Sequence, residues 1–210
     1  VKNVVLISTD KAVKPFNVMG LTKRFSEKIL KYFNKKNKKT IYSSVRFGNV
    51  LESSGSVIPI FREQIKKGGP LTVTHKDVKR FFMTIREAAE LVIQSSSLSK
   101  NNGEVFILKM GSEVNIFLLA KKMINLSGLE YKNIENPKGD IEIEITGLKE
   151  GEKLSEKLLH NENIETTEHP KIMKVIPKFF NLEKKEIEIE YLKDLIKKGD
   201  QNKLIDELKK

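Results

Sequence analysis

Cysteine is absent from the 210-residue chain, and so are long apolar runs. Without cysteine the protein can have neither disulfides nor thiolate metal sites. No apolar run approaches the ~20 residues that a membrane-spanning helix requires, and no charged-then-apolar leader precedes the first elements. These absences predict a cytoplasmic location, and the length suits one ordinary domain or one and a half small ones.

Arginine is scarce relative to lysine, although the formal net charge is +11. Of 39 basic residues, 34 are Lys and five are Arg, whereas recognition of phosphates and bases favours the forked guanidinium of Arg. The Lys residues are spread along the chain and interleaved with Glu, a pattern typical of a solvated surface. We therefore expect no nucleic-acid partner.

Metal ligands are also few. The three His residues, His75, His160 and His169, lie far apart in the sequence and show no spacing typical of a metal site. Because thiolates are excluded as well, we expect no bound metal.

Residues 1–47 show the pattern of a strand–helix–strand unit. Val4–Ile7 is a short apolar run rich in β-branched residues, as in a parallel strand buried on both faces. Apolar residues at three- and four-residue spacing predict a helix over about 18–34, and Ile41–Phe47 has the composition of the next strand. Such units build doubly wound α/β sheets.

Turn and capping signals divide the rest of the chain. We expect helices over about 57–67, 84–97, 115–128 and 152–159, and strands over 71–74, 104–108 and 141–145. Thr84 with Glu87 three residues later fits a capping box, and Asn115 fits an N-cap. The last thirty residues are rich in Lys and Glu with a helical Leu/Ile pattern, which predicts a peripheral helix.

Functional side chains gather where the first strand is expected to end. Thr9, Asp10 and Lys11 follow Val4–Ile7 directly, and ligands of open α/β sheets bind beyond the carboxyl ends of the strands. Lys23 lies on the helix that follows, one turn past Met19 and off its apolar stripe. Taken singly, Asp10 fits the cap of a turn and Lys23 an exposed helix position. Taken together, Thr9, Asp10, Lys11 and Lys23 predict a ligand-binding site at this edge of the sheet.

Motifs along the chain occur in the same order as in one enzyme family. They are Ser8-Thr9-Asp10-Lys11-Ala12, Met19-x-x-x-Lys23, Val45-Arg46-Phe47-Gly48-Asn49-Val50, Ser53-Ser54-Gly55-Ser56-Val57-Ile58-Pro59, Gly69-Pro70-Leu71-Thr72-Val73-Thr74-His75, Arg80-Phe81-Phe82-Met83-Thr84 and Thr146-Gly147-Leu148-Lys149-Glu150-Gly151-Glu152-Lys153-Leu154. They resemble the inverting UDP-N-acetylglucosamine 4,6-dehydratases of the polysaccharide-biosynthesis (CapD-like) branch of the extended short-chain dehydrogenase/reductases. The resemblance covers about residues 4–160.

The resemblance implies a fold and three regions. The fold is a partial Rossmann-like, doubly wound parallel sheet containing only the later strands, with a small α/β substrate-binding subdomain. Residues 1–50 would be a truncated dinucleotide-binding portion with the catalytic segment. Residues 51–170 would form the substrate-binding subdomain, with 104–109 returning to the main sheet, and 171–210 a peripheral helical tail.

The resemblance also implies roles in an NAD(P)-dependent reaction on a UDP-sugar. Thr9 would bond the C4 hydroxyl, Asp10 would act as acid toward the departing C6 hydroxyl, and Lys11 would be the base at C5. Lys23 would hold the nicotinamide ribose. The further cofactor-binding residues would be Ser8 and Arg46. The substrate-binding residues would be Asn49, Ser54, Val57, Arg80 and Glu152, with Arg80 directed to the pyrophosphate or uridine, although it would also suit a simple ion pair with Glu87.

Three departures from the family pattern qualify these implications. Met19 stands where many relatives have Tyr, and a thioether cannot exchange protons. Larger membrane-anchored relatives share this Met, and Asp10 or Lys11 would then replace the Tyr. Glu52 replaces an expected Gly, in a loop that needs unusual backbone angles. No Gly-x-Gly-x-x-Gly follows a strand, so we expect a carboxy-terminal half that binds NAD or NADP poorly on its own and associates with the missing half or with a second copy.

The same residues are compatible with two further functions. One is a sugar epimerase of the same superfamily, although epimerisation through a C4 ketone needs no additional acid and base. The other is a remnant that holds a UDP-sugar without turning it over.

Overall fold

Two compact units make up the chain in the computed structural model, which describes residues 1–13, 15, 17–36, 39–53, 55–100, 103–156, 163–176 and 189–209. Unit 1 contains Val1–Phe47, Glu90–Lys109 and Lys157–Lys210. Unit 2 contains Gly48–Ala89 and Met110–Glu156. The fold is mixed α/β, as the strand–helix–strand pattern predicts.

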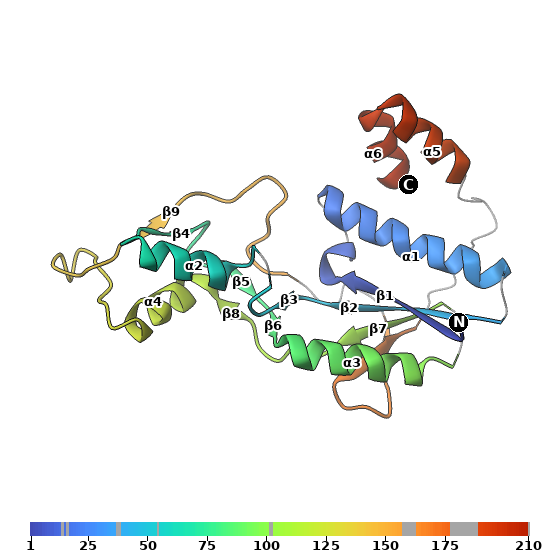
Figure 1. The fold of residues 1–210 in the computed structure, drawn as a ribbon, viewed down its shortest axis with the longest axis horizontal. Coiled ribbons are helices and arrows are strands. Elements are labelled where there is room, and N and C mark those ends of the chain that lie inside the picture. The colour runs from blue at the N-terminus through green and yellow to red at the C-terminus, as the bar shows by residue number, and fades with distance from the viewer. Residues whose placement is uncertain are drawn as a thin grey trace. The chain divides into compact units, whose positions relative to one another are not determined.

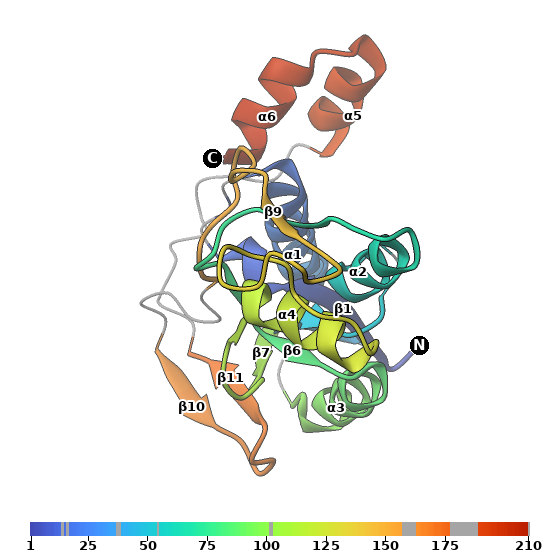
Figure 2. The same cartoon turned by 90° about the vertical axis from the view of Figure 1, so that its left-hand side faces the viewer.

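Unit 1 is built on a five-stranded sheet with the order β1-β2-β7-β11-β10. Its strands are β1 (Asn3–Thr9), β2 (Ile41–Phe47), β7 (Glu104–Leu108), β10 (Ile164–Thr166) and β11 (Ile172–Val175). The first three are parallel to one another, whereas β11 pairs antiparallel with both β7 and β10, at the edge visible in Figure 2. β2 and β7 supply fully buried residues such as Val45 and Ile107. Within the described part of the chain, β1 is paired on one side only.

Helices lie on both faces of this sheet (Figure 1). α1 (Val18–Lys36) lies on one face against β1 and β2, and α3 (Ile85–Leu98) runs along the other. Two carboxy-terminal helices, α5 (Ile189–Lys198) and α6 (Gln201–Lys209), pack together beyond α1. A short 3₁₀ turn, η1 (Asp10–Ala12), directly follows β1.

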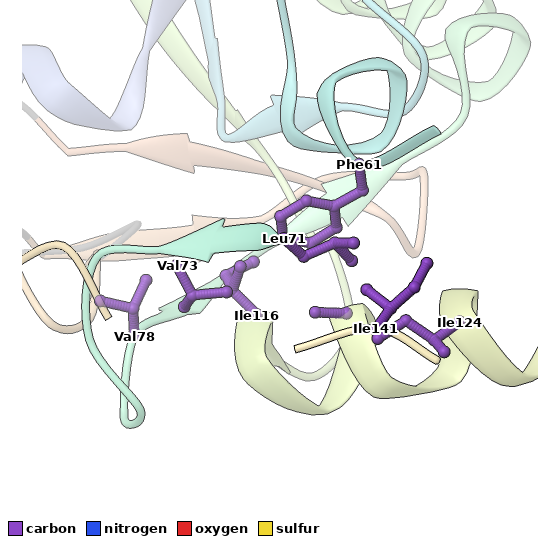
Figure 3. Packing of buried hydrophobic residues seen from close by; sticks show 8 residues of the cluster. Phe61, Leu71, Val73, Val78, Ile116, Ile124 and Ile141 are labelled. Carbon is purple, nitrogen blue, oxygen red and sulfur yellow. The ribbon is translucent and has the colours of Figure 1, made fainter. Parts of the chain in front are cut away.

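Unit 2 has three short two-stranded pairs and two helices around an apolar core. The pairs are β3 (Asn49–Val50) with β6 (Phe82–Met83), β4 (Leu71–Val73) with β9 (Ile143–Ile145), and β5 (Lys79–Arg80) with β8 (Val114–Asn115). The helices are α2 (Val57–Lys66) and α4 (Ile116–Leu126). Figure 3 shows Phe61 of α2 beside Leu71 of β4, with Ile124 and Ile141 close by. Apolar burial of this kind is the main stabilising term available to so small a unit.

The N-cap predicted at Asn115 is confirmed, and so is one of the two hydrogen bonds of the capping box predicted at Thr84. The amide of Glu87 donates to Thr84 Oγ1 over 3.1 Å at the start of α3, and the amide of Leu118 donates to Asn115 Oδ1 over 2.9 Å at the start of α4. Gly128, which was predicted to end α4, has a φ of 75° and so adopts the left-handed conformation usual after a helix.

Three predicted elements differ from the structure. The helix expected from Glu152 is not formed over 152–156, where the chain instead bridges β5 through Ser155; residues 157–159 lie outside the described part. The segment expected to return to the main sheet does so as β7, whereas residues 90–100, expected in the subdomain of 51–170, also group with unit 1. The region predicted as a helical tail begins with a strand, β11. The bridge of Ser155 to β5 and the pairing of β11 with β7 both join segments distant in sequence, which local patterns do not record.

Lys174 joins three strands at this edge of the unit 1 sheet. Its ammonium lies 2.6 Å from Glu165 Oε1 of β10 and 3.3 Å from Glu104 Oε1 of β7. The hydrogen bond to Glu165, and then that to Glu104, raise the pKa of Lys174 above its ordinary value of 10.5. When folding raises the pKa of a basic group, the charged group stabilises the fold fully at any pH below the pKa of the unfolded chain. This stabilisation is lost as the pH rises through the higher pKa of the folded protein.

A Lys174→Met variant should therefore be less stable than the parent at neutral pH. The expected loss is only roughly 1 kcal/mol, because the ion pairs of Lys174 with Glu165 and Glu104 are partly exposed to solvent. The difference should shrink as the pH rises above 10.5, the ordinary value of this group. Urea unfolding at neutral and strongly alkaline pH measures it. Lys100→Met, which removes an ion pair to Glu168 between largely exposed side chains, should change stability less; equal effects would contradict the prediction.

Candidate functional site

Thr9, Asp10 and Lys11 form a hydrogen-bonded cluster where β1 ends. Thr9 Oγ1 donates to Asp10 Oδ1 over 2.9 Å, and Lys11 Nζ donates to the same oxygen over 3.0 Å. The Thr9 hydroxyl also caps η1 by accepting from the amide of Lys11. The structure thus brings together three residues that the sequence predicted as catalytic, and it places a carboxyl and an amine in direct contact.

The second oxygen of the Asp10 carboxyl is unusual. Asp10 is only 3% exposed, and Oδ2 has no hydrogen-bond partner in the part of the chain that the structure describes. A buried polar atom without a partner costs free energy. A ligand hydroxyl that donated to Oδ2 would remove this cost, so the geometry suits a group that takes part in binding or proton transfer.

α1 places Lys23 against β1, at a residue two positions before Thr9. Its ammonium donates to the carbonyl oxygen of Ile7 over 3.1 Å. An ammonium has three donors, and among the described residues the other two have no partner, so they could bind a ligand. Met19, one turn earlier, is 46% exposed. Asn17 Oδ1 accepts from the amide of Gly20 over 2.9 Å and so caps the helix.

Gly20 is a site residue that the sequence interpretation missed. A Cβ atom at this position would collide with the carbonyl oxygen of Lys11, so only glycine lets α1 approach the turn that carries the cluster. A signal was present, because glycine within a helix costs about 1 kcal/mol relative to alanine and is retained for a packing or functional reason.

Ser8 and Arg46, both predicted to bind the cofactor, meet on Glu27 of α1. Ser8 Oγ donates to Glu27 Oε1 over 2.6 Å, while Arg46 donates through Nε to Oε1 over 2.8 Å and through Nη2 to Oε2 over 2.7 Å. All three residues are buried. Contact of Ser8 and Arg46 with a cofactor stays a prediction; Glu27 was not anticipated at all.

Two residues predicted to bind substrate meet in unit 2. Arg80 Nη2 donates to Glu152 Oε1 over 2.9 Å, and this oxygen also accepts from Thr74 Oγ1 over 2.9 Å. Glu152 Oε2 accepts from the amide of Lys149 over 3.2 Å, which anchors the Gly-containing loop that precedes it. The ion pair considered for Arg80 from sequence involved Glu87; in the structure its partner is Glu152.

The other predicted substrate-binding positions also lie in unit 2. Asn49 begins β3, and both its amide and its side-chain Nδ2 donate to the carbonyl oxygen of Phe81. Val57 begins α2 and is half-buried against the apolar core. Ser54 lies outside the described residues. Glu52, where the resemblance suggested glycine, has a φ of 59° and so adopts the left-handed conformation.

Within the described ranges, no group of three or more His, Asp and Glu residues is placed to hold a metal ion. None of the helices described there has the length and apolarity required to cross a membrane.

The family model for polysaccharide biosynthesis proteins matches residues 1–177. The chain belongs to this family. Capsular polysaccharide biosynthesis protein CapD of Staphylococcus aureus is 52% identical over 164 residues, which are 78% of this chain and 26% of CapD. UDP-glucose 4-epimerase of Rickettsia canadensis is 36% identical over 170 residues, 80% of this chain and 46% of that enzyme.

Solved structures of other proteins also match the chain. The structure of Pen from Bacillus thuringiensis superposes with a TM-score of 0.72 at 34% identity, over 95% of this chain and 63% of Pen. DesIV of Streptomyces venezuelae, a dTDP-glucose 4,6-dehydratase crystallised with NAD, matches at a TM-score of 0.61 and 15% identity, over 74% of this chain and 51% of DesIV. The latter likeness concerns the fold. The chain is thus similar in fold to a dTDP-glucose 4,6-dehydratase and in sequence to a UDP-glucose 4-epimerase. It spans about a quarter to a half of the curated relatives named above.

Proposed function

We propose that this chain supplies the catalytic and substrate-binding residues of a nucleotide-sugar 4,6-dehydratase in surface polysaccharide biosynthesis. The substrate class is a UDP-N-acetylglucosamine-type sugar nucleotide. The observation that carries the proposal is the contact between the Asp10 carboxyl and the Lys11 amine at the end of β1. Elimination of water needs an acid at one carbon and a base at its neighbour, and this pair offers both.

The contact between the two groups also gives every proton a destination. Lys11 takes the proton that the C4 hydroxyl releases on oxidation and passes it to Asp10 across the 3.0 Å hydrogen bond between them. Asp10 then gives this proton to the departing C6 hydroxyl, so that water leaves, while Lys11, neutral again, takes the proton from C5 and returns it to C5 when C6 is reduced. Thr9, which already donates to Asp10, would orient the carboxyl and bond the C4 hydroxyl. This relay does not require the Tyr that Met19 replaces.

A nicotinamide dinucleotide would complete the chemistry by accepting a hydride from C4 and returning it to C6. Lys23 fits such a group, because its ammonium lies at the end of β1 with two donors available beyond the bond to Ile7. Its positive charge would also stabilise negative charge that develops on the C4 oxygen. In unit 2, Arg80 and Glu152 are the residues that would bind the nucleotide part of the substrate, with Asn49 and Val57.

A 4-epimerase is the second candidate, and it is favoured by the similarity to the Rickettsia canadensis enzyme of that name. The two reactions share oxidation at C4 but differ at C5. Only elimination breaks the C5–H bond, so only the dehydratase exchanges that hydrogen with solvent.

The test is a product analysis in D₂O. Because the chain spans 26% of CapD, the assay uses a CapD chimera in which this chain replaces the matching segment, incubated with UDP-N-acetylglucosamine and NAD. We expect a 4-keto-6-deoxy sugar that carries deuterium at C5, detected by mass spectrometry and NMR. A C4 epimer without deuterium at C5 would establish the epimerase instead.

A further inference from the structure

Two successive residues of β1 are tied to two residues of α1 that lie one helical turn apart. Lys23 Nζ donates to the carbonyl oxygen of Ile7, and Glu27 accepts from the hydroxyl of Ser8. Residues four apart occupy the same face of a helix. The face of α1 that carries Lys23 is therefore attached to the strand at two adjacent points.

The register of the sheet explains why Glu27 can hold both β1 and β2. Ser8 of β1 and Arg46 of β2 are Cα partners in the parallel ladder, so their side chains leave the sheet on the same face. The Glu27 carboxylate accepts one hydrogen bond from Ser8 and a bidentate pair of hydrogen bonds from the Arg46 guanidinium. Such paired bonds between guanidinium and carboxylate fix direction as well as distance.

Stability alone is a poor explanation for this arrangement. Glu27 and Arg46 are 6% and 8% exposed, and removing charges from water largely offsets their attraction. Apolar side chains of similar volume would often stabilise the same position equally well. What the charged cluster adds is geometric restraint, since rotating α1 by one residue would turn its side chains by about 100° and shift them by about 1.5 Å.

We propose that Glu27 is a positioning residue, which through Ser8 and Arg46 fixes the axial and rotational setting of α1 and so holds the Lys23 ammonium at the carbonyl oxygen of Ile7. Its importance for turnover rests on the proposed function. The structural part of the proposal is independent of that function: the hydrogen-bonded cluster of Ser8, Glu27 and Arg46, here called the clamp, sets the position of Lys23.

The first test measures Lys23 directly in the 210-residue chain. Each lysine is labelled competitively with an acylating reagent, and the extent of labelling is read by peptide mass spectrometry. Glu27→Gln keeps the shape of the side chain and removes its charge. We expect labelling of Lys23 to rise about fivefold, the change that corresponds to loss of one ordinary hydrogen bond, while labelling of Lys66 in unit 2 stays constant.

The matched control is Val45→Ala. Val45 is fully buried in β2 next to Arg46, so this variant loses stability in the same unit without altering the clamp. Labelling of Lys23 should change less than about twofold in it, because a hydrogen bond to Ile7 is retained. An equal rise in both variants, or no rise in Glu27→Gln, would show that Glu27 serves stability alone.

If Glu27→Gln does not fold, a second variant still tests the positioning role of Glu27. The double replacement Glu27→Leu with Arg46→Met removes both charges and keeps an apolar contact. We expect a folded unit 1 in which Lys23 is nonetheless labelled faster than in the parent. A folded double variant with Lys23 as protected as in the parent would overturn the proposal.

The CapD chimera separates this inference from the proposed function. There Glu27→Gln should lower kcat by up to about 10²-fold, as expected when a catalytic group is misplaced by about 1 Å, with a smaller effect on KM for the sugar nucleotide. If the parent chimera turns over no sugar nucleotide while Lys23 still responds in the labelling experiment, the proposed function fails and the positioning role stands.

Discussion

An Asp10→Asn variant should lose sugar-nucleotide dehydration by about 10²–10⁴-fold, the usual contribution of one acid–base group. Asn has nearly the same shape as Asp, so the turn that Thr9 caps should persist, but an amide cannot deliver a proton to the C6 hydroxyl. The loss should appear in kcat more than in KM, because proton transfer acts on the reaction and not on the binding of the nucleotide. Steady-state kinetics of the CapD chimera measure both constants.

The control for this variant is Asp194→Asn on α5, an acid whose ion pair to Lys198 lies on the surface. Surface pairs contribute little to stability, so kcat and the thermal midpoint should both stay near the parent values. A second readout is oxidation at C4 alone, followed as NADH absorbance in a single turnover. This should survive in Asp10→Asn, since Asp10 acts after the hydride has left. Full dehydration activity in Asp10→Asn would remove Asp10 from the acid role.

The part of the site on β1 was predictable because its residues are contiguous. Thr9, Asp10 and Lys11 follow one apolar run, and the end of a parallel strand is where ligands bind in such sheets. Lys23 was predictable from helical spacing. In both cases the information lies within about one strand–helix unit, where periodicity and capping decide the local structure.

The contacts that the sequence did not reveal join residues far apart in the chain. Glu27 shows only as another charged residue of a Lys-rich helix, and its burial depends on the register that sets Ser8 opposite Arg46. Arg80 and Glu152 are separated by 72 positions. Their pairing requires β4, β5 and the loop before Glu152 to be in place. Contacts between these distant segments also explain why the helix predicted from Glu152 does not form over 152–156.

The antiparallel edge was missed for a related reason. β10 and β11 are three and four residues long, and so short a strand is specified by its neighbours more than by its own composition. Lys174 and Glu165 look like solvated surface in the sequence. In the structure they lie side by side on paired strands.

A Phe61→Ala variant should destabilise unit 2 by about 3–5 kcal/mol, the range found when a fully buried aromatic side chain is truncated. Phe61 is 1% exposed and belongs to the apolar cluster shared by α2, α4 and β4, as Figure 3 shows. A loss of this size is a large part of the stability of an ordinary domain. Hydrogen exchange under native conditions measures it, since amides of α4 report on unit 2 and amides of β2 on unit 1.

Ile60→Ala is the matched control, because Ile60 precedes Phe61 on the same helix but is 43% exposed. Its effect should be smaller, on the order of 1 kcal/mol or less. The expected pattern is a selective loss of protection in α4 for Phe61→Ala, with β2 unchanged. Because Arg80 and Glu152 belong to unit 2, the same variant should weaken UDP binding in proportion to the fraction of unit 2 that is unfolded. Equal loss of protection in both units would mean that they unfold as one, and that Phe61 stabilises the whole chain.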